Sequence, residues 1–518
     1  MLGSQVVSDF ELSSIAPQLP TCTSWGRERF LSGLQTCTSE WKEIKQRQLP
    51  LLVFKTQPEF RASARTLLQT IQTSVVDDCL QNNDPRIQEH ITQIFWQKKS
   101  MGSFLNTSPL VLNSLCIWKT ICLPILAILM PICMVLVPFF IQRIICPEQE
   151  FQDHVSDYLS TFRSALLAHM RIPEFLKAKH SEDRIGFLFE SLFLALALTM
   201  FVSSIWNQIS LSLHLRRIWF DIERRGKELR NLRFVVQSIV AQLQSLPKRV
   251  QSGVRTLREQ GESILEQTAS YTGYDNVTTF GSFWNDSTHL QSCKEWIAHV
   301  DVLLSIASLP NICFPKARTQ LGIELVQAYH PNIQPCVPNN LSLRSHCIVT
   351  GPNRGGKSTF CKTVGLSILT AQSWGFAFAK RMTWSPFHCM YSALEPCGKL
   401  GISSTFEAEI EFAKTVLALP KKPTFIMMDE IFHSTNANDG IIASKVFLDR
   451  LYKQPHILSV VSTHYTELAY HYTDTVVPLQ LVTNGTNKQS LTYTYKVAEG
   501  VSEVSSVMDI LTERGLAL

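Results

Sequence analysis

The sequence has few charged residues and no closely paired cysteines. Asp, Glu, Lys and Arg make up 18% of the 518 residues, below the usual share of about 25%, and 45% are hydrophobic, which excludes a chain that is disordered throughout. None of the 14 cysteines forms a Cys-x-x-Cys pair, so a zinc ribbon or disulfide scaffold is not expected, and reduced thiols in a cytosol-like compartment fit better. The first 20 residues lack a basic stretch followed by an apolar core, so no cleaved secretory signal is expected. The length suggests about three domains.

Two segments of 23 residues each, 120–142 and 191–213, contain no charged side chain. A bilayer core about 30 Å thick needs roughly 20 helical residues, so both segments are long enough to cross it. Three prolines in the first segment are tolerated better in a membrane helix than in a soluble one. The alternatives are a buried hairpin of short helices for the first segment and a buried core helix for the second, which Asn207 and Gln208 dilute.

These two spans predict a transmembrane hairpin over 113–214, and hence a multi-pass membrane protein that contacts the lipid bilayer through 120–142 and 191–213. Five basic residues follow the second span closely: Arg216, Arg217, Arg224, Arg225 and Lys227. Because basic residues flanking a span favour the cytoplasmic side, we expect the C-terminal part of the chain to lie there.

The region after the second segment is basic and has a helical repeat. The formal net charge of the chain is +5, and 211–270 alone carries an excess of the same size. Apolar residues repeat there at alternating spacings of three and four, which predicts a helix with a narrow apolar seam that ends before Pro247: Leu229, Leu232, Val236, Ile239, Leu243 and Leu246. Its basic residues, from Arg216 to Arg258, could face solvent, anionic lipid headgroups or nucleic-acid phosphates.

Residues 347–359 combine a short apolar run with a glycine-rich loop. The run predicts a strand that ends at Thr350, and the loop completes the pattern G-x-x-x-x-G-K-[ST] before a predicted helix. Glycines let backbone N–H groups close around an anion, and the helix N-terminus adds partial positive charge. The pattern predicts a bound nucleotide and Mg²⁺, with Lys357 at the β- and γ-phosphates and Ser358 on the Mg²⁺. The predicted nucleotide-binding residues are Gly351, Pro352, Asn353, Arg354, Gly355, Gly356, Lys357, Ser358 and Thr359.

Two further apolar runs end in residues that suit phosphate chemistry. Phe425 to Met428 precede Asp429 and Glu430, as in a buried parallel strand that delivers two carboxylates to the phosphate loop. Asp429 is predicted to hold the Mg²⁺, and Glu430 to orient or deprotonate the attacking water. A third run, 457–461, leads to His464. A lone histidine is usually structural, but at the carboxyl end of such a strand it is well placed to contact a γ-phosphate.

Together these motifs closely resemble the ATPase domain of the MutS family of DNA mismatch-repair proteins, over roughly residues 290–518. The phosphate loop is similar to the family's TGPNMGGKST, with Arg354 in place of methionine. Three more segments resemble the family's STFMxEM, DEIGRGTSxxDG and ATHYxEL motifs, in that order: 404–410, 429–440 and 462–468.

The resemblance implies a P-loop ATPase domain of the ABC type that pairs with a second copy or a related subunit, as a homodimer or heterodimer. It also implies that Ser404 contacts the partner's γ-phosphate in trans, that Asp439 lies beside the nucleotide at the dimer contact, and that His464 senses the phosphate. In that family ATP binding and hydrolysis gate DNA binding, so DNA is an expected partner.

The sequence also departs from the family pattern. Phe432, His433 and Ser434 replace the family's Gly-Arg-Gly, placing a bulky aromatic residue in a tight loop beside the catalytic acids, which we expect to affect hydrolysis rather than nucleotide binding. The chain contains no Phe-x-Glu, the pair with which the repair proteins probe a mismatch, so mismatch recognition by this chain alone is not expected. The LSGGQ motif of transporter ATPases is also absent, which argues against an ordinary ABC transporter.

The predicted fold class is α plus α/β. The domains are a helical N-terminal region (1–112), the transmembrane hairpin (113–214), a helical lever-like connector (215–320) and a MutS-like P-loop ATPase domain (321–518). The predicted function is that of a membrane-tethered MutS-like ATPase that binds DNA in an ATP-dependent way. Two alternatives act without DNA: a mechanochemical membrane ATPase and a nucleotide-dependent scaffold.

Overall fold

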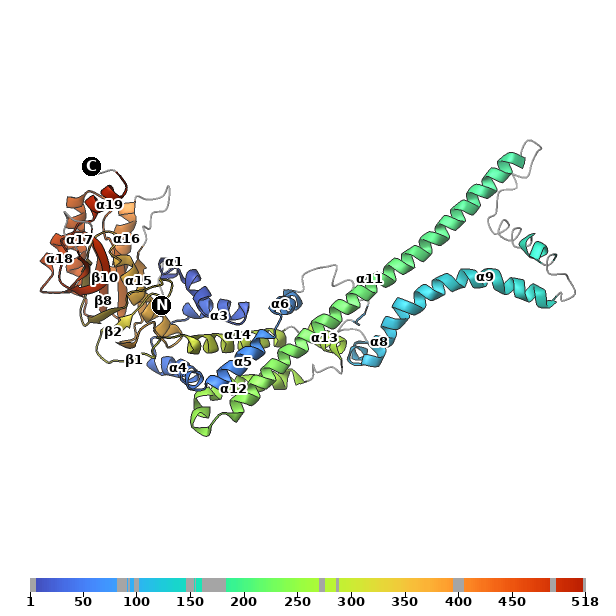
Figure 1. The fold of residues 1–518 in the computed structure, drawn as a ribbon, viewed down its shortest axis with the longest axis horizontal. Coiled ribbons are helices and arrows are strands. Elements are labelled where there is room, and N and C mark those ends of the chain that lie inside the picture. Colours follow the sequence, from blue (N-terminus) through green and yellow to red (C-terminus); the bar gives the residue numbers. More distant parts are fainter. Residues whose placement is uncertain are drawn as a thin grey trace. The chain divides into compact units, whose positions relative to one another are not determined.

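A computed structural model of the chain divides into two compact units, each assembled from separate stretches of sequence (Figure 1). Unit 1 combines Met1–Thr73, Phe234–Glu266 and Ser292–Leu518, and unit 2 combines Ser74–Arg233 and Gln267–Gln291. The residues that the structure describes are 6–81, 91, 94–96, 102–145, 153, 155–160, 183–269, 275–285, 288–394, 405–484 and 491–515.

The core of unit 1 is a six-stranded sheet in the order β10-β9-β4-β8-β7-β6. All neighbours pair in parallel except β10, which runs antiparallel to β9. The carboxyl ends of the parallel strands therefore meet at one edge, as the sequence predicted for the phosphate loop and the acids. The strands are β4 (Cys347–Thr350), β6 (Cys389–Ala393), β7 (Thr424–Asp429), β8 (Ile457–Ser462), β9 (Val477–Asn484) and β10 (Thr492–Glu499).

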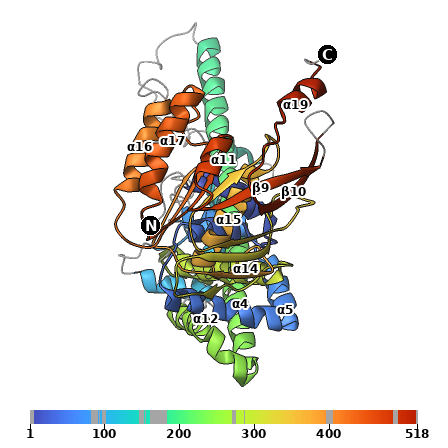
Figure 2. The ribbon, with the colours of Figure 1, turned by 90° about the vertical axis from the view of Figure 1, so that its left-hand side faces the viewer.

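Helices cover both faces of this sheet, because successive side chains of a strand point to opposite faces. On one face Met427 of β7 packs against α15, where a Cβ on Gly365 would lie 2.4 Å from Met427. On the other face Ile426 and Met428 join a buried apolar cluster with Phe447 of α17. The ribbon shows α16 and α17 side by side (Figure 2). The helices are α15 (Lys357–Ser373), α16 (Thr405–Leu417), α17 (Ala437–Leu451), α18 (Thr466–His471) and α19 (Val507–Glu513).

A smaller sheet in the order β1-β5-β2-β3 also belongs to unit 1. Strand β2 runs antiparallel to both of its neighbours, and β1 pairs in parallel with β5. Its strands are β1 (Lys316–Ala317), β2 (Ile323–Ala328), β3 (Asn339–Leu343) and β5 (Arg381–Trp384).

The N-terminal helices pack onto the C-terminal part of unit 1. Arg47 donates to the carbonyl oxygens of Gln372 (3.2 Å) and Ser373 (2.6 Å) at the end of α15, and Arg61 donates to that of Ala307 (2.8 Å) near the end of α14. A cation there satisfies carbonyls that the helix leaves unpaired and complements its dipole. The helices are α1 (Val6–Asp9), α2 (Leu12–Ile15), η1 (Ala16–Gln18), α3 (Ser24–Leu34), α4 (Trp41–Thr56), α5 (Pro58–Gln69) and α14 (Thr288–Ser308).

A buried carboxylate fixes the start of α3. Asp301 of α14 is fully buried and accepts hydrogen bonds from the backbone N–H groups of Cys22 (2.9 Å) and Thr23 (2.8 Å) and from the Thr23 hydroxyl (2.7 Å). Three donors at a helix N-terminus stabilise a carboxylate that would otherwise be costly to bury. The N-terminal segment is thus an integral part of unit 1.

Unit 2 is helical within the residues described. It contains η2 (Ser103–Thr107), α8 (Pro109–Ile117), the π-helical turn η3 (Trp118–Cys122), α9 (Leu123–Ile145), α13 (Asn276–Asn285) and most of α6 (Thr73–Gln81). Helix α11 (Asp183–Ser245) has 63 residues and contributes to both units, and α12 (Lys248–Gln267) follows it. The predicted seam is confirmed: α11 ends before Pro247, and all six seam residues are buried.

The prediction of two membrane spans and a multi-pass membrane protein is wrong. Among the described residues, one helical stretch, Pro109–Met130, is long and apolar enough to cross a membrane, and it only partly overlaps the predicted span 120–142. The other predicted span, 191–213, lies inside the continuous helix α11, where polar residues such as Asn207 and Gln208 dilute the apolar character. Hydropathy measures composition over a window and does not identify what a helix packs against, so one apolar stretch is weak support for a membrane anchor.

Candidate functional site

The phosphate loop begins where the buried strand β4 ends. Gly356, the residue before α15, has φ 98°, a left-handed conformation that glycine adopts without strain. A Cβ there would also lie 3.3 Å from the ring of Tyr495. The loop therefore leads directly into the N-terminus of α15, an arrangement in which free backbone N–H groups favour an anion.

A cavity of about 560 Å³ opens beside this loop. Lys357, Ser358 and Thr359 line it together with apolar residues from the preceding segment and one aromatic residue of β10: Ile333, Pro335, Val337 and Tyr495. Volumes of roughly 300–1,000 Å³ are typical of small-molecule sites. The cavity thus offers a phosphate end and an apolar end of suitable size for a nucleotide.

Lys357 is buried and bound to its own loop. Its Nζ donates to the carbonyl oxygens of Gly351 (3.0 Å) and Pro352 (3.3 Å) and lies 3.4 Å from Nε2 of His464. Burial lowers the pKa of Lys357 from 10.5, and the charges of Glu430 and Asp429 act in the opposite direction. These carbonyl contacts keep a buried ammonium satisfied at the position predicted for the phosphates.

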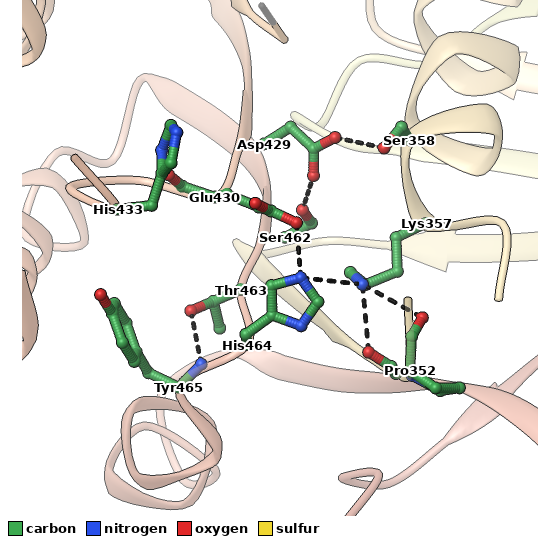
Figure 3. Close-up of polar contacts among 11 residues, drawn as sticks. Pro352, Lys357, Ser358, Asp429, Glu430, His433, Ser462, Thr463, His464 and Tyr465 are labelled. Atoms are coloured by element: carbon green, nitrogen blue, oxygen red, sulfur yellow. Dashed lines mark hydrogen bonds and ion pairs between the residues drawn. The ribbon is translucent and has the colours of Figure 1, made fainter. Parts of the chain in front are cut away.

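Asp429 lies between two hydroxyl groups at the carboxyl edge of the sheet. One carboxylate oxygen accepts from Ser358 and the other from Ser462, which ends the neighbouring strand β8 (Figure 3). A hydroxyl and a carboxylate facing each other are hard oxygen donors that suit Mg²⁺, whose remaining ligands in such sites are phosphate oxygens and water. Ser358 and Asp429 thus fit the predicted metal. Sequence reasoning assigned no role to Ser462, although it belongs to the 462–468 motif.

Glu430 and His464 form a close pair in the same place (Figure 3). Oε1 of Glu430 lies 2.5 Å from Nε2 of His464, and each side chain is 36% exposed. The hydrogen bond with His464 lowers the pKa of Glu430 below 4.5, although burial opposes the shift. Glu430 is therefore a carboxylate at neutral pH, the form that can accept a proton from water.

A family model for MutS domain V matches residues 347–516, the segment that carries the phosphate loop, both acids and His464. Residues 347–516 are thus similar to a domain of the MutS family. Proteins of the MutS family are ATPases, which agrees with the chemistry of the site.

Curated relatives match part of the chain. The DNA mismatch repair protein msh3 of Aspergillus fumigatus is 27% identical over 240 residues, which cover 42% of this chain and 21% of that protein. The proteins of the same name from Botryotinia fuckeliana and Emericella nidulans are 27% and 25% identical over 209 and 241 residues, covering 37% and 43% of this chain and 18% and 22% of theirs. This chain therefore spans about a fifth of the length of these relatives. Their names place them in DNA repair, which also contradicts the predicted multi-pass membrane location with the ATPase domain on the cytoplasmic side.

The structure does not bring two predicted residues of the MutS pattern to the phosphate loop: Asp439 lies away from it, and Ser404 is outside the described residues. Asp439 is exposed in the first turn of α17, where its backbone N–H donates to the side chain of the capping residue Asn436 (2.9 Å). It does not line the cavity beside the phosphate loop. Ser404 lies outside the described residues.

The ring of Phe432 does not line the cavity beside the phosphate loop. The side chain is buried in an aromatic cluster, with ring centroids 5.9 Å from Phe406 of α16 and 6.1 Å from Phe447 of α17. Its backbone has φ 53°, which favours the glycine of the family motif. Burial of the ring thus holds a strained loop in place.

The two residues after Phe432 bind a carboxylate that sequence reasoning missed. Glu409 of α16 lies 3.1 Å from Nδ1 of His433 and accepts a hydrogen bond from Ser434 (2.7 Å). Its position in the 404–410 motif was the available signal. The loop after Glu430 is therefore tied to α16, the helix that follows Ser404 in the chain.

Replacing Phe432 separates the packing of the ring from the strain of the backbone. Phe432→Ala is expected to destabilise unit 1 by about 3–5 kcal/mol through the lost burial. Phe432→Gly should cost about 1 kcal/mol less than alanine, because glycine tolerates φ 53°. Urea unfolding followed by tryptophan fluorescence gives the order of the two variants, and a glycine variant less stable than alanine would contradict this account.

Proposed function

We propose that this chain binds ATP with Mg²⁺ and hydrolyses it. The observation that carries the proposal is the meeting of Lys357, Ser358, Asp429, Glu430 and His464 at one edge of the sheet, beside a cavity of about 560 Å³. These five residues lie at or shortly after the carboxyl ends of three strands, and they supply a buried cation, two metal ligands, a general base and a histidine. No other part of the described chain combines these groups.

Each residue has a role that follows from its contacts. Lys357 exchanges the carbonyls of Gly351 and Pro352 for phosphate oxygens, while Ser358 and Asp429 hold the Mg²⁺, which neutralises phosphate charge when bound. Glu430 orients the attacking water and accepts its proton. His464, in contact with both Glu430 and Lys357, senses whether the γ-phosphate is present.

The ATPase domain is further proposed to act as a dimer, either with a second copy or with a related subunit. Ser404 then contacts the nucleotide of the partner, and the exposed Asp439 lies at the dimer contact. The contacts of Glu409 with His433 and Ser434 support this proposal, because they connect α16 to the loop that follows the catalytic carboxylate. Partner binding at Ser404 thereby influences hydrolysis.

ATP binding and hydrolysis are proposed to gate DNA binding. The similarity to MutS domain V and to the repair relatives supports DNA as the partner. Because the chain lacks Phe-x-Glu, we do not propose that it recognises mismatches by itself. Helix α11 offers exposed basic residues for phosphate contacts: Arg216, Arg217, Arg224, Lys227 and Arg230. Of the three interpretations of this basic stretch, phosphate binding agrees best with the family.

A salt series tests DNA binding by α11. We expect the full chain to bind duplex or branched DNA, and the triple variant Arg216→Gln/Arg217→Gln/Arg224→Gln to lower the slope of log K against log salt by about 3. A variant with Lys380→Gln, Arg381→Gln and Lys414→Gln, three exposed basic residues of unit 1, is the matched control. Equal slopes for all three proteins would remove α11 from the interface. No DNA binding, and no DNA effect on ATP turnover, would favour the nucleotide-dependent scaffold.

A further inference from the structure

Arg354 places an additional cation at the tip of the phosphate loop. Where the family motif has methionine, this chain has a guanidinium that lines the nucleotide cavity together with Lys357 and Ser358. The residue has φ 64°, so its backbone follows the turn of the loop. A flexible cation at this position is within reach of any phosphate that the loop binds.

The guanidinium is already engaged by a carboxylate. Nη1 of Arg354 forms an ion pair with Oε2 of Glu513, the last residue of α19, and the two side chains are 42% and 62% exposed. Exposed ion pairs contribute little to stability, because water competes for both charges. The contact is therefore one that a stronger ligand can displace.

Helix α19 is attached to the rest of unit 1 by few groups. None of its residues is buried, and Val507 and Met508 are more than half exposed. Besides the ion pair, Asp509 accepts hydrogen bonds from the backbone N–H of Leu491 (3.3 Å) and from the hydroxyl of Tyr493 (3.5 Å). The Arg354 contact joins the last residue of this helix to the phosphate loop, so its loss would free that end of the helix from the loop.

A phosphate is a stronger partner than Glu513 for this guanidinium. Arginine binds phosphate oxygens through parallel charge-assisted hydrogen bonds, and a triphosphate in the cavity carries several negative charges beside the loop. The same charges would repel Glu513 once its partner has left. Both effects favour exchange of the carboxylate for a phosphate.

We propose that Arg354 binds the phosphates of the nucleotide. When no nucleotide is bound, Glu513 occupies the guanidinium of Arg354, so triphosphate binding displaces Glu513 and releases α19. The inference rests on the proposed nucleotide binding and adds a residue and a regulated element to it. Because coupling between two equilibria is reciprocal, weakening the Glu513 contact must strengthen nucleotide binding.

A mutant cycle on the full chain tests the exchange, with Mg²⁺ and the non-hydrolysable analogue AMP-PNP as the probe in titration calorimetry. Arg354→Met is expected to weaken binding about tenfold, and Arg354→Lys to restore part of the loss. Glu513→Gln is expected to tighten binding about threefold, but only when Arg354 is present. The double variant should therefore bind like Arg354→Met.

Hydrogen exchange of residues 507–513 supplies a readout that a purely structural role of Arg354 would not move. AMP-PNP should speed exchange in the wild-type chain, whereas Arg354→Met should exchange fast with or without the nucleotide. The replacement of Glu513 by phosphate is wrong, and nucleotide binding stands, if the wild type and Arg354→Met bind AMP-PNP equally well. The same conclusion follows if Glu513→Gln tightens binding both with and without Arg354. If the wild type does not bind AMP-PNP, both nucleotide binding and the replacement of Glu513 are wrong.

Discussion

Lys357→Ala is expected to abolish measurable ATP binding. The ammonium is buried beside the phosphate loop, with two backbone carbonyls as its partners, and a bound phosphate would take their place. Removing one partner of a buried charged contact typically costs about 3–5 kcal/mol, which corresponds to a more than hundredfold weaker affinity. Calorimetric titration with Mg²⁺ and AMP-PNP measures the loss.

Two further variants separate this effect from misfolding. Lys357→Met keeps the length of the aliphatic stem and should lose binding to a similar extent. Lys362→Ala removes the same charge from the same helix, at a residue that pairs with Glu11 outside the cavity, and should bind the nucleotide nearly as the wild type does. Retained affinity in Lys357→Met would show that the charge of Lys357 is not what binds the phosphates.

Glu430→Gln is expected to bind ATP but to turn it over about 10²–10⁴ times more slowly, the usual range for loss of a general base. The glutamine keeps the shape of the side chain but cannot accept the proton of the attacking water. Because the pKa of Glu430 is lowered, its carboxylate is present from below pH 4.5 upward, so loss of activity between pH 8 and pH 5 should not come from its protonation. Single-turnover ATP hydrolysis across that pH range tests both statements.

The same variant should accumulate the paired state. If hydrolysis opens the dimer, Glu430→Gln with Mg²⁺ and ATP should run as a dimer in light scattering under conditions where the wild type dissociates. Glu411→Gln, an exposed carboxylate of α16 that pairs with Lys414, is the control and should resemble the wild type. Unchanged turnover in Glu430→Gln would remove it from its catalytic role, whereas a slow monomer would contradict the dimer alone.

The packing of Phe432 bears on how fast this site can work. From the sequence we expected the aromatic side chain of Phe432 to lie beside the catalytic acids. In the structure its ring packs against Phe406 and Phe447 instead. The loop after Glu430 is consequently held to α16 and α17 by apolar contacts, in addition to the polar contacts of Glu409. We expect this to limit how far Glu430 can move during a cycle.

The two uncharged segments show where composition is an insufficient guide. Segments 120–142 and 191–213 have the length and lack of charge of membrane helices, yet only Pro109–Met130 retains that character among the described residues. A hydropathy average over a short window does not reveal that the segment 191–213 is part of one continuous helix of 63 residues. By contrast, the seam of α11 was predicted correctly, because its spacing follows directly from the helical repeat.

The positions of the phosphate loop and of the two acids could be predicted from local sequence features alone. The strand, the glycine-rich loop and the helix that begins at Lys357 follow one another directly, and an apolar run that ends in Asp429 and Glu430 is typical of a buried strand beside such a loop. The parallel order of the strands then brings their ends together. The contacts between distant residues became visible only in the folded chain: Asp429 with Ser462, Phe432 with Phe447, Arg354 with Glu513, and Asp301 with Thr23. Such contacts depend on how whole elements pack, and neither spacing nor residue type encodes that packing locally.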